Sequence, residues 1–164
     1  MVPIRLVRWP LALLGLLVAG PLAAQEVTLG GPFVSDPGAP VEVTSETLNV
    51  DQTTGQAVFT GNVVVVQGDL RLQAAAVEVR YDEQGQEITR LLATGGVTLV
   101  GPAEAAEAEE ADYDLAAGTL TMTGEVLLTQ GPSAISADRM VVDLEAGTAQ
   151  MDGNVRTVLQ RAAE

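Results

Sequence analysis

The stretch DQTTGQAVFTGNVVVV, residues 51–66, decides the fold. It opens with Asp and a turn that ends in Gly, and its apolar side chains then fall on alternate positions, as in a strand with one buried face. The same arrangement recurs from Asp82, Asp114 and Asp143. These steps of roughly 30 residues are typical of stacked supersecondary units. We therefore predict an all-β chain built from repeated hairpins.

A second Gly strengthens the repeat. In three of the four units it follows six positions after the turn Gly, and a Val comes two positions later. The pairs are Gly61 and Val63, Gly124 and Val126, and Gly153 and Val155. Because side chains in a strand repeat every two residues, the same face should be apolar in every unit.

The first residues differ from the repeats. Arg5 and Arg8 precede an apolar segment from Leu11 to Ala19, and Leu22-Ala23-Ala24 fits a signal-peptidase site. An uncleaved membrane anchor is the alternative, but the apolar stretch from Trp9 to Ala24 is interrupted by Pro and Gly and is shorter than the roughly 20 residues of a membrane span. The predicted organisation is a cleaved signal peptide over residues 1–24, a flexible lead-in over 25–39 and one domain over 40–160.

The composition excludes several functions. The net charge is −14 at pH 7, with 22 acidic residues against eight basic ones, all of which are Arg. Such a polyanion repels nucleic acid and anionic membranes, since binding to both requires clusters of positive charge. His, Cys and Lys are absent, which removes the usual imidazole bases, thiolates, zinc sites and Schiff bases.

Carboxylates remain as candidate catalytic groups, and a pair of them can hydrolyse glycosides. However, the recurring Asp residues stand beside turns, where an Asp side chain caps its own backbone. We interpret them as structural and predict no enzymatic activity and no cofactor.

One segment lacks the alternation of large apolar residues. Residues 101–112 interleave Glu with Ala, and we interpret them as a solvated loop. A cation site is the alternative, because carboxylates suit calcium, but the spacing of the acids does not resemble a calcium-binding loop.

The expected interior is aliphatic. After residue 24 the aromatic residues are Phe33, Phe59, Tyr81 and Tyr113, and Val, Leu, Ala and Met dominate the inward positions. Such an interior is either a filled core or a slot for an apolar ligand. The residue pattern leaves both interpretations open.

Residues 40–81, PVEVTSETLNVDQTTGQAVFTGNVVVVQGDLRLQAAAVEVRY, resemble the start of the LptA, or OstA-like, family of periplasmic lipopolysaccharide-transport proteins. The most specific element is VFTGNVVVVQGDLRL at 58–72. Weaker resemblances follow in order at 88–100, 111–128 and 135–159. Gly96 and Glu125 depart from the family, which more often has Asn at these positions.

The resemblance implies an OstA-like β-jelly roll of many short antiparallel strands, open and V-shaped, with a hydrophobic groove for the acyl chains of lipopolysaccharide. It implies a bridge in the periplasm of a Gram-negative bacterium, which carries the lipid from an inner-membrane complex to an outer-membrane translocon through edge strands and head-to-tail self-association. The expected lipid-binding residues are Val41, Val43, Phe59, Val63, Val65, Val97, Leu99, Tyr113, Leu115, Leu120 and Met122. The expected partner-binding edge is Asn154, Val155 and Val158.

Two other functions fit the same pattern. One is a membrane-anchored jelly-roll component of the same transport system. The other is a self-assembling scaffold of β-repeats without a ligand, because hairpin periodicity alone does not require a groove.

Overall fold

The computed structural model describes residues 33, 36, 38–51 and 53–159. This part of the chain forms ten strands in one open antiparallel sheet, which confirms the all-β prediction. The strands are β1 (Glu42–Thr44), β2 (Thr47–Asp51), β3 (Gln56–Gln67), β4 (Leu70–Tyr81), β5 (Ile88–Val100), β6 (Glu104–Asp114), β7 (Thr119–Gln130), β8 (Ser133–Asp143), β9 (Thr148–Asp152) and β10 (Arg156–Val158). Their order is β1-β3-β4-β5-β6-β7-β8-β10, with β2 also paired to β3 and β9 to β8.

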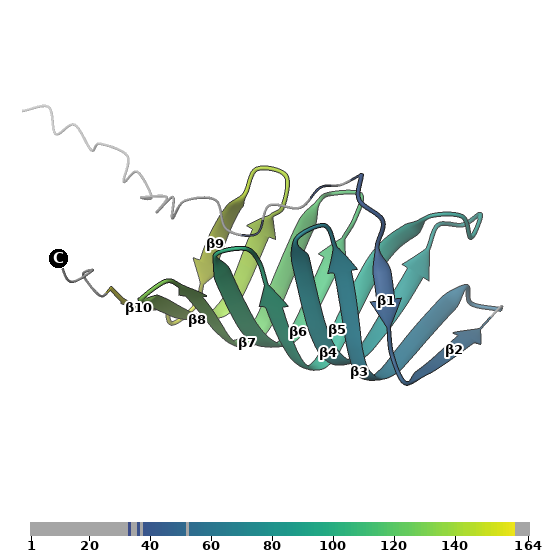
Figure 1. Ribbon diagram of the computed structural model, residues 1–164, viewed down its shortest axis with the longest axis horizontal. Coiled ribbons are helices and arrows are strands. Elements are labelled where there is room, and N and C mark those ends of the chain that lie inside the picture. Colours follow the sequence, from purple (N-terminus) through teal and green to yellow (C-terminus); the bar gives the residue numbers. More distant parts are fainter. Residues whose placement is uncertain (1–32, 34–35, 37, 52, 160–164) are drawn as a thin grey trace, which may run out of the picture.

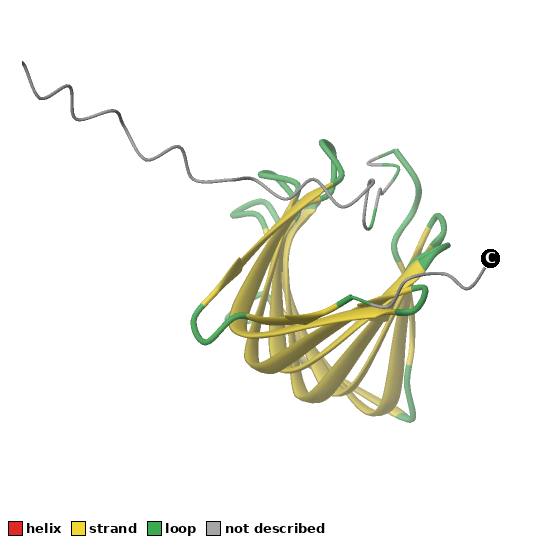
Figure 2. Ribbon diagram, turned by 90° about the vertical axis from the view of Figure 1, so that its left-hand side faces the viewer, coloured by secondary structure: helices red, strands yellow, loops and turns green. Residues whose placement is uncertain are grey.

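Each long strand bends near its middle, and the sheet thereby folds into two layers that meet along one line of corners (Figures 1 and 2). Layer A contains β2, β9 and the halves of the long strands at 47–60, 76–94, 110–123 and 139–152. Layer B contains β1, β10 and the halves at 63–74, 97–108 and 126–137. Figure 2 looks along the resulting V, whose two layers are apart on the side opposite the corners.

Two consecutive residues with left-handed backbone make each of four corners. They are Gly61-Asn62, Gly95-Gly96, Gly124-Glu125 and Gly153-Asn154, with φ between 45° and 86°. The first residue of each pair must be Gly for a second reason: a Cβ at Gly61 would lie 2.8 Å from the Cβ of Glu46, and the other three corners are equally tight. The second Gly of the sequence repeat is therefore the residue that bends the sheet.

Hydrogen bonds fasten the first and last of these corners. Asn62 Nδ2 donates to Glu46 Oε1 at 2.6 Å, and Asn154 Nδ2 donates to Asp138 Oδ2 at 2.8 Å. In the third corner Glu125 occupies the position of the Asn. The side chain of Glu109 passes over the preceding Gly124, so Glu125 stands where the first and last corners have the Asn that donates to such a carboxylate.

The recurring Asp residues cap the turns of layer A, as the sequence predicted. Asp51 Oδ1 accepts the backbone N–H of Thr53 at 2.8 Å, and this bond is the main cause that lowers the pKa of Asp51. The corresponding carboxylates accept in the same way from Gln86 (Asp82), Ala117 (Asp114) and Ala146 (Asp143). The repeat of Asp thus has a structural cause in each turn.

The interpretation of residues 101–112 as a solvated loop is wrong, because most of this segment is strand β6. Ala106 and Ala111 face the core and are buried, whereas Glu107 and Glu110 face solvent. Strands β5 and β7 pair with β6 along both of its edges. This backbone pairing, together with the burial of Ala on one face, outweighs the low intrinsic β-propensity of Ala and Glu.

Phe33 is buried, although the sequence placed it in the lead-in. Its side chain is fully inaccessible, and its backbone N–H donates to Glu104 Oε1 at 2.7 Å. Glu104 is itself buried at the start of β6. The predicted signal peptide lies outside the described residues, and within the described ranges no helix is long and apolar enough to cross a membrane.

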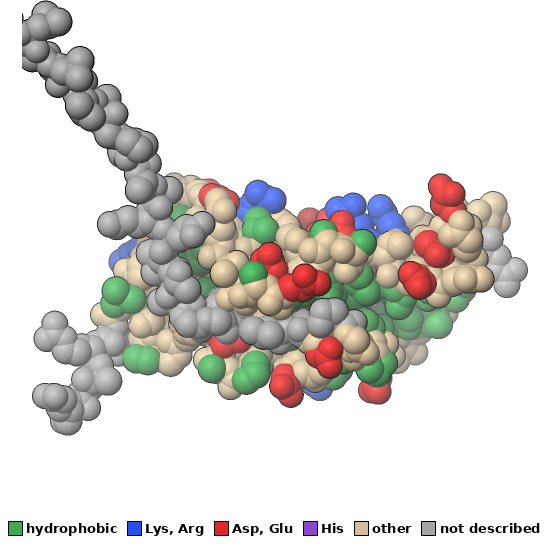
Figure 3. All heavy atoms as spheres, turned by 90° about the horizontal axis from the view of Figure 1, so that it is seen from above, with side chains coloured by type: hydrophobic (Ala, Val, Ile, Leu, Met, Phe, Trp, Pro, Cys, Tyr) green, Lys and Arg blue, Asp and Glu red, His purple; other side chains and the backbone are tan. Residues whose placement is uncertain are grey.

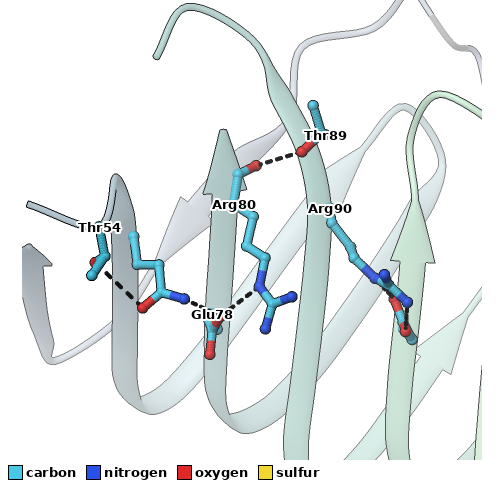
Figure 4. A network of polar contacts seen from close by, with 7 residues as sticks. Thr54, Glu78, Arg80, Thr89 and Arg90 are labelled. Carbon is cyan, nitrogen blue, oxygen red and sulfur yellow. Dashed lines mark hydrogen bonds and ion pairs between the residues drawn. The ribbon is translucent and has the colours of Figure 1, made fainter. Parts of the chain in front are cut away.

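The outer face of layer A is polar (Figure 4). Arg80 pairs with Glu78 on its own strand at 2.7 Å, and Arg90 on β5 pairs with Asp112 on β6. Asp112 also raises the pKa of Arg90. Because these side chains are exposed, each pair adds little to stability, and their effect is to keep this face in contact with water.

The third corner generates a prediction. We expect Glu125→Asn to stabilise the fold by about 1 kcal/mol, since its amide can donate to Glu109 as Asn62 and Asn154 donate in their corners, and Asn suits left-handed backbone better. The melting temperature should rise by a few degrees. Glu107→Gln, an equal charge change on the exposed face of β6, is the control and should leave it nearly unchanged. A lower melting temperature for Glu125→Asn would contradict our account of the corners.

Candidate functional site: a hydrophobic groove between the layers

A groove runs between the inner faces of the two layers. It narrows to a cavity of about 40 Å³. The lining is Val41, Val65, Gln67, Leu70, Leu72, Val77, Leu91, Ala93, Leu99, Ala111, Tyr113, Leu120 and Leu144. Figure 3 looks onto the open side, where hydrophobic side chains are visible between polar rims toward the β2 end.

The strand register aligns the apolar residues into rows that cross the strands. In layer A the row begins at Phe59 on β3 and continues through β4 to β9. Its members are Phe59, Val77, Ala93, Ala111, Met122, Met140 and Met151. A row in layer B contains Val43, Val65, Leu72, Leu99, Ala106, Leu128 and Ile135. The apolar surface is therefore continuous along the long axis of the molecule.

A hydrogen bond joins the two layers across this groove. Tyr113 lies in layer A, at the end of β6, and its hydroxyl donates to Gln67 Oε1 at 3.1 Å. Gln67 ends β3 in layer B and donates through Nε2 to the carbonyl oxygen of Ala39 at 3.3 Å. Both side chains lie next to the turns at the open side, so this bond spans the mouth of the groove.

The inner face of layer A is uncovered at the β2 end. Leu48 and Val50 are 51% and 62% exposed, and together with Phe59 and Tyr81 they line a hollow of about 250 Å³. At the opposite end, Val155, Val158 and Leu159 are exposed beside or within β10. Apolar side chains thus meet solvent at both ends of the sheet.

The structure places every predicted lipid-binding residue on the inner side of the sheet or against its core. Five line the cavity: Val41, Val65, Leu99, Tyr113 and Leu120. Val63, Val97 and Met122 are buried in the core, and Val43, Phe59 and Leu115 pack partly buried against it. Of the predicted edge residues, Val155 and Val158 are exposed, whereas the amide of Asn154 is engaged with Asp138 at a corner.

Eight of the thirteen lining residues were not among the predicted lipid-binding residues, and for two of them, Leu144 and Gln67, the reason can be identified. Leu144 belongs to a turn, yet its side chain is 3% exposed and closes the groove. Its equivalent one repeat earlier, Leu115, also packs against the core, so the repeat itself held the signal. Gln67 was overlooked because it is polar. It nevertheless occupies one of the alternate positions of β3 that face inward, together with Val63 and Val65.

Within the residues described here, no three His, Cys, Asp or Glu side chains gather as they would around a metal ion. The acidic side chains of β6 are spread along one exposed strand face, apart from Glu104, which bonds to Phe33.

Comparisons with known proteins agree with this geometry. The crystal structure of LptH from Pseudomonas aeruginosa, described as the LptA-homologous periplasmic component of a lipopolysaccharide transport device, superposes with a TM-score of 0.69 at 17% identity. It covers 77% of this chain and 99% of that structure, which shows the same fold.

A relative found by sequence matches a smaller part of this chain than LptH does. An uncharacterized protein of Rhizobium meliloti (strain 1021) is 31% identical over 90 residues, a match that covers 51% of this chain. The chain spans about half the length of this curated relative, with 48% of it matched.

The family is shown by the match to a family model. The model described as "LptA/(LptD N-terminal domain) LPS transport protein" matches residues 42–148, which is more than half of the chain and spans most of the folded sheet. On this match, and with a fold shared with LptH, the chain belongs to the LptA and LptD N-terminal domain family of lipopolysaccharide transport proteins.

Proposed function

We propose that the protein is a periplasmic bridge component that shields the acyl chains of lipopolysaccharide on their way to the outer membrane. The observation that carries this proposal is the continuous apolar row on the inner face of each layer. A filled core would need only local contacts. A row that reaches from β3 to β9 gives a bound acyl chain apolar contacts at every strand along the molecule.

The energetics suit a carrier. An acyl chain of about a dozen carbons in water costs on the order of 10 kcal/mol, at roughly 0.8 kcal/mol per methylene. Contacts with Val, Leu, Ala and Met side chains remove this cost without fixing a position, since apolar burial is non-directional. The lipid can therefore move along the groove while it stays shielded.

The layers must separate to admit a lipid. An apolar cavity of about 150 Å³ can hold benzene, whereas the narrow part of this groove has a volume of about 40 Å³. Each half of a long strand pairs only with halves that lie in the same layer. The backbone therefore connects the two layers only at the corners. Opening at the mouth would therefore break side-chain contacts and leave the sheet intact.

The ends of the sheet are the proposed contacts with the inner-membrane complex, the outer-membrane translocon and further copies of the chain. Edge strands β2 and β10 each have one edge without a strand partner among the described residues. An unpaired edge can accept a strand from another domain. Val155 and Val158 would supply apolar contacts there, since the side chain of Asn154 is held at its corner.

The first test concerns the faces of the sheet. We expect a photo-crosslinking amino acid at Tyr113, which lines the groove, to capture lipopolysaccharide. The same amino acid at Thr121, on the opposite parity of β7, should capture little. The measurement is the fraction of crosslinked protein detected with an antibody against the lipid. Equal capture at the two positions would contradict the assignment of the groove.

The second test concerns the C-terminal edge. Val158→Pro removes a backbone donor from β10, and we expect at least a tenfold weaker pull-down of the translocon's jelly-roll domain. Retention of lipid should survive, because β10 does not line the cavity. Val158→Ala keeps the donor and serves as the control. Loss of lipid with intact partner binding would place β10 in the groove instead of at the partner contact.

A further inference from the structure

Two polar side chains stand in an otherwise aliphatic groove. Among the described residues that line it, Gln67 and Tyr113 alone carry hydrogen-bonding side chains. A few placed polar groups in an apolar pocket usually fix the orientation of a ligand and select among ligands. These two come from opposite layers and meet at the mouth.

Their position matches the junction between the chain and the head group of a bound lipid. Gln67 is the last residue of β3, and Tyr113 is the residue before the last of β6, so both lie within two residues of the turns at the open side. A lipid whose tail enters between the layers keeps its sugar outside. The first polar atoms of its chain, an ester or amide carbonyl, would then lie at the level of this pair.

Opening the groove changes the hydrogen bonding of the pair. The bond from Tyr113 to Gln67 joins the two layers, so it breaks when they separate. The Tyr113 hydroxyl then loses Gln67 Oε1 as an acceptor, and the loss of a hydrogen bond at a partly buried site is unfavourable. A ligand that offers a hydrogen-bond acceptor at this place accepts from the Tyr113 hydroxyl in place of Gln67 Oε1, whereas a plain hydrocarbon does not.

We propose that Gln67 and Tyr113 form a polar station that selects acyl lipids: the two side chains bond to each other in the empty groove and to the acyl carbonyl in the loaded one. In the loaded groove the Tyr113 hydroxyl donates to the carbonyl oxygen of the lipid, with the Gln67 amide beside it. This assignment rests on the proposed function, and it makes Tyr113 a specificity-determining residue that Gln67 positions in the empty groove.

Two amphiphiles with disaccharide heads and the same chain length separate the possibilities. Sucrose monolaurate has an ester carbonyl at the head of its chain, and dodecyl maltoside has an ether link. Their dissociation constants, measured by isothermal titration calorimetry below the critical micelle concentrations, should differ about fivefold in favour of the ester for the unaltered protein.

The double variant Gln67→Leu with Tyr113→Phe removes the polar pair and keeps the volume of the lining. We expect the ratio of its dissociation constants for the ether and the ester to fall to about one, with the ether bound at least as tightly as by the unaltered protein. Gln73→Leu is the matched control, because it makes the same change on the exposed face of β4 and should keep the fivefold preference. Melting curves check folding, and the single variant Tyr113→Phe provides a milder change that should lose part of the preference.

The outcomes are distinct. Equal binding of ester and ether by the unaltered protein would overturn the polar station and leave a lipid-binding groove. A preference that survives in the double variant would likewise overturn it, since other groups would be responsible. If neither amphiphile binds, the groove does not take acyl chains, and the proposed function fails together with this inference.

Discussion

The bend at each corner is the constraint on which the rest of the structure depends. A flat ten-stranded sheet with this sequence would expose its entire apolar face to water. Two left-handed residues in β3, β5 and β7, and the same device between β9 and β10, fold the sheet onto itself and bury that face. The Gly at each bend has no substitute, because both its φ and the side chain that crosses it exclude a Cβ.

The V shape follows from these corners, and with it the chemistry of the interior. Both layers belong to one sheet, so backbone pairing holds each layer together and leaves only side-chain contacts between them at the mouth. A closed barrel would instead lock its interior with strand pairing all around. An interior held mainly by aliphatic contacts can open at a modest cost, which suits a protein that loads and releases an apolar chain.

Much of this architecture could be predicted from the sequence, because the repeat shows both the turns and the corners. The parity of Val63, Val97 and Met122 correctly predicted burial. Pairing with distant neighbours could not be predicted: β6 is a strand because β5 and β7 flank it, and Val155 is exposed because it lies at the edge, although its equivalents Val63 and Val126 are buried. Nothing in the lead-in signals that Phe33 reaches the core. The groove differs from a filled core only in how closely the layers approach, which a residue pattern does not encode.

The central claim is that the inner apolar rows hold lipid. Native mass spectrometry of the protein, purified from its own host without detergent, tests it most directly. We expect a fraction of the protein to carry an added mass equal to lipopolysaccharide, and to lose it when Val65 and Leu99, both in the groove lining, are replaced by Asp. Protein that is folded and assembled but free of lipid in every preparation would contradict the claim and favour a scaffold without a ligand.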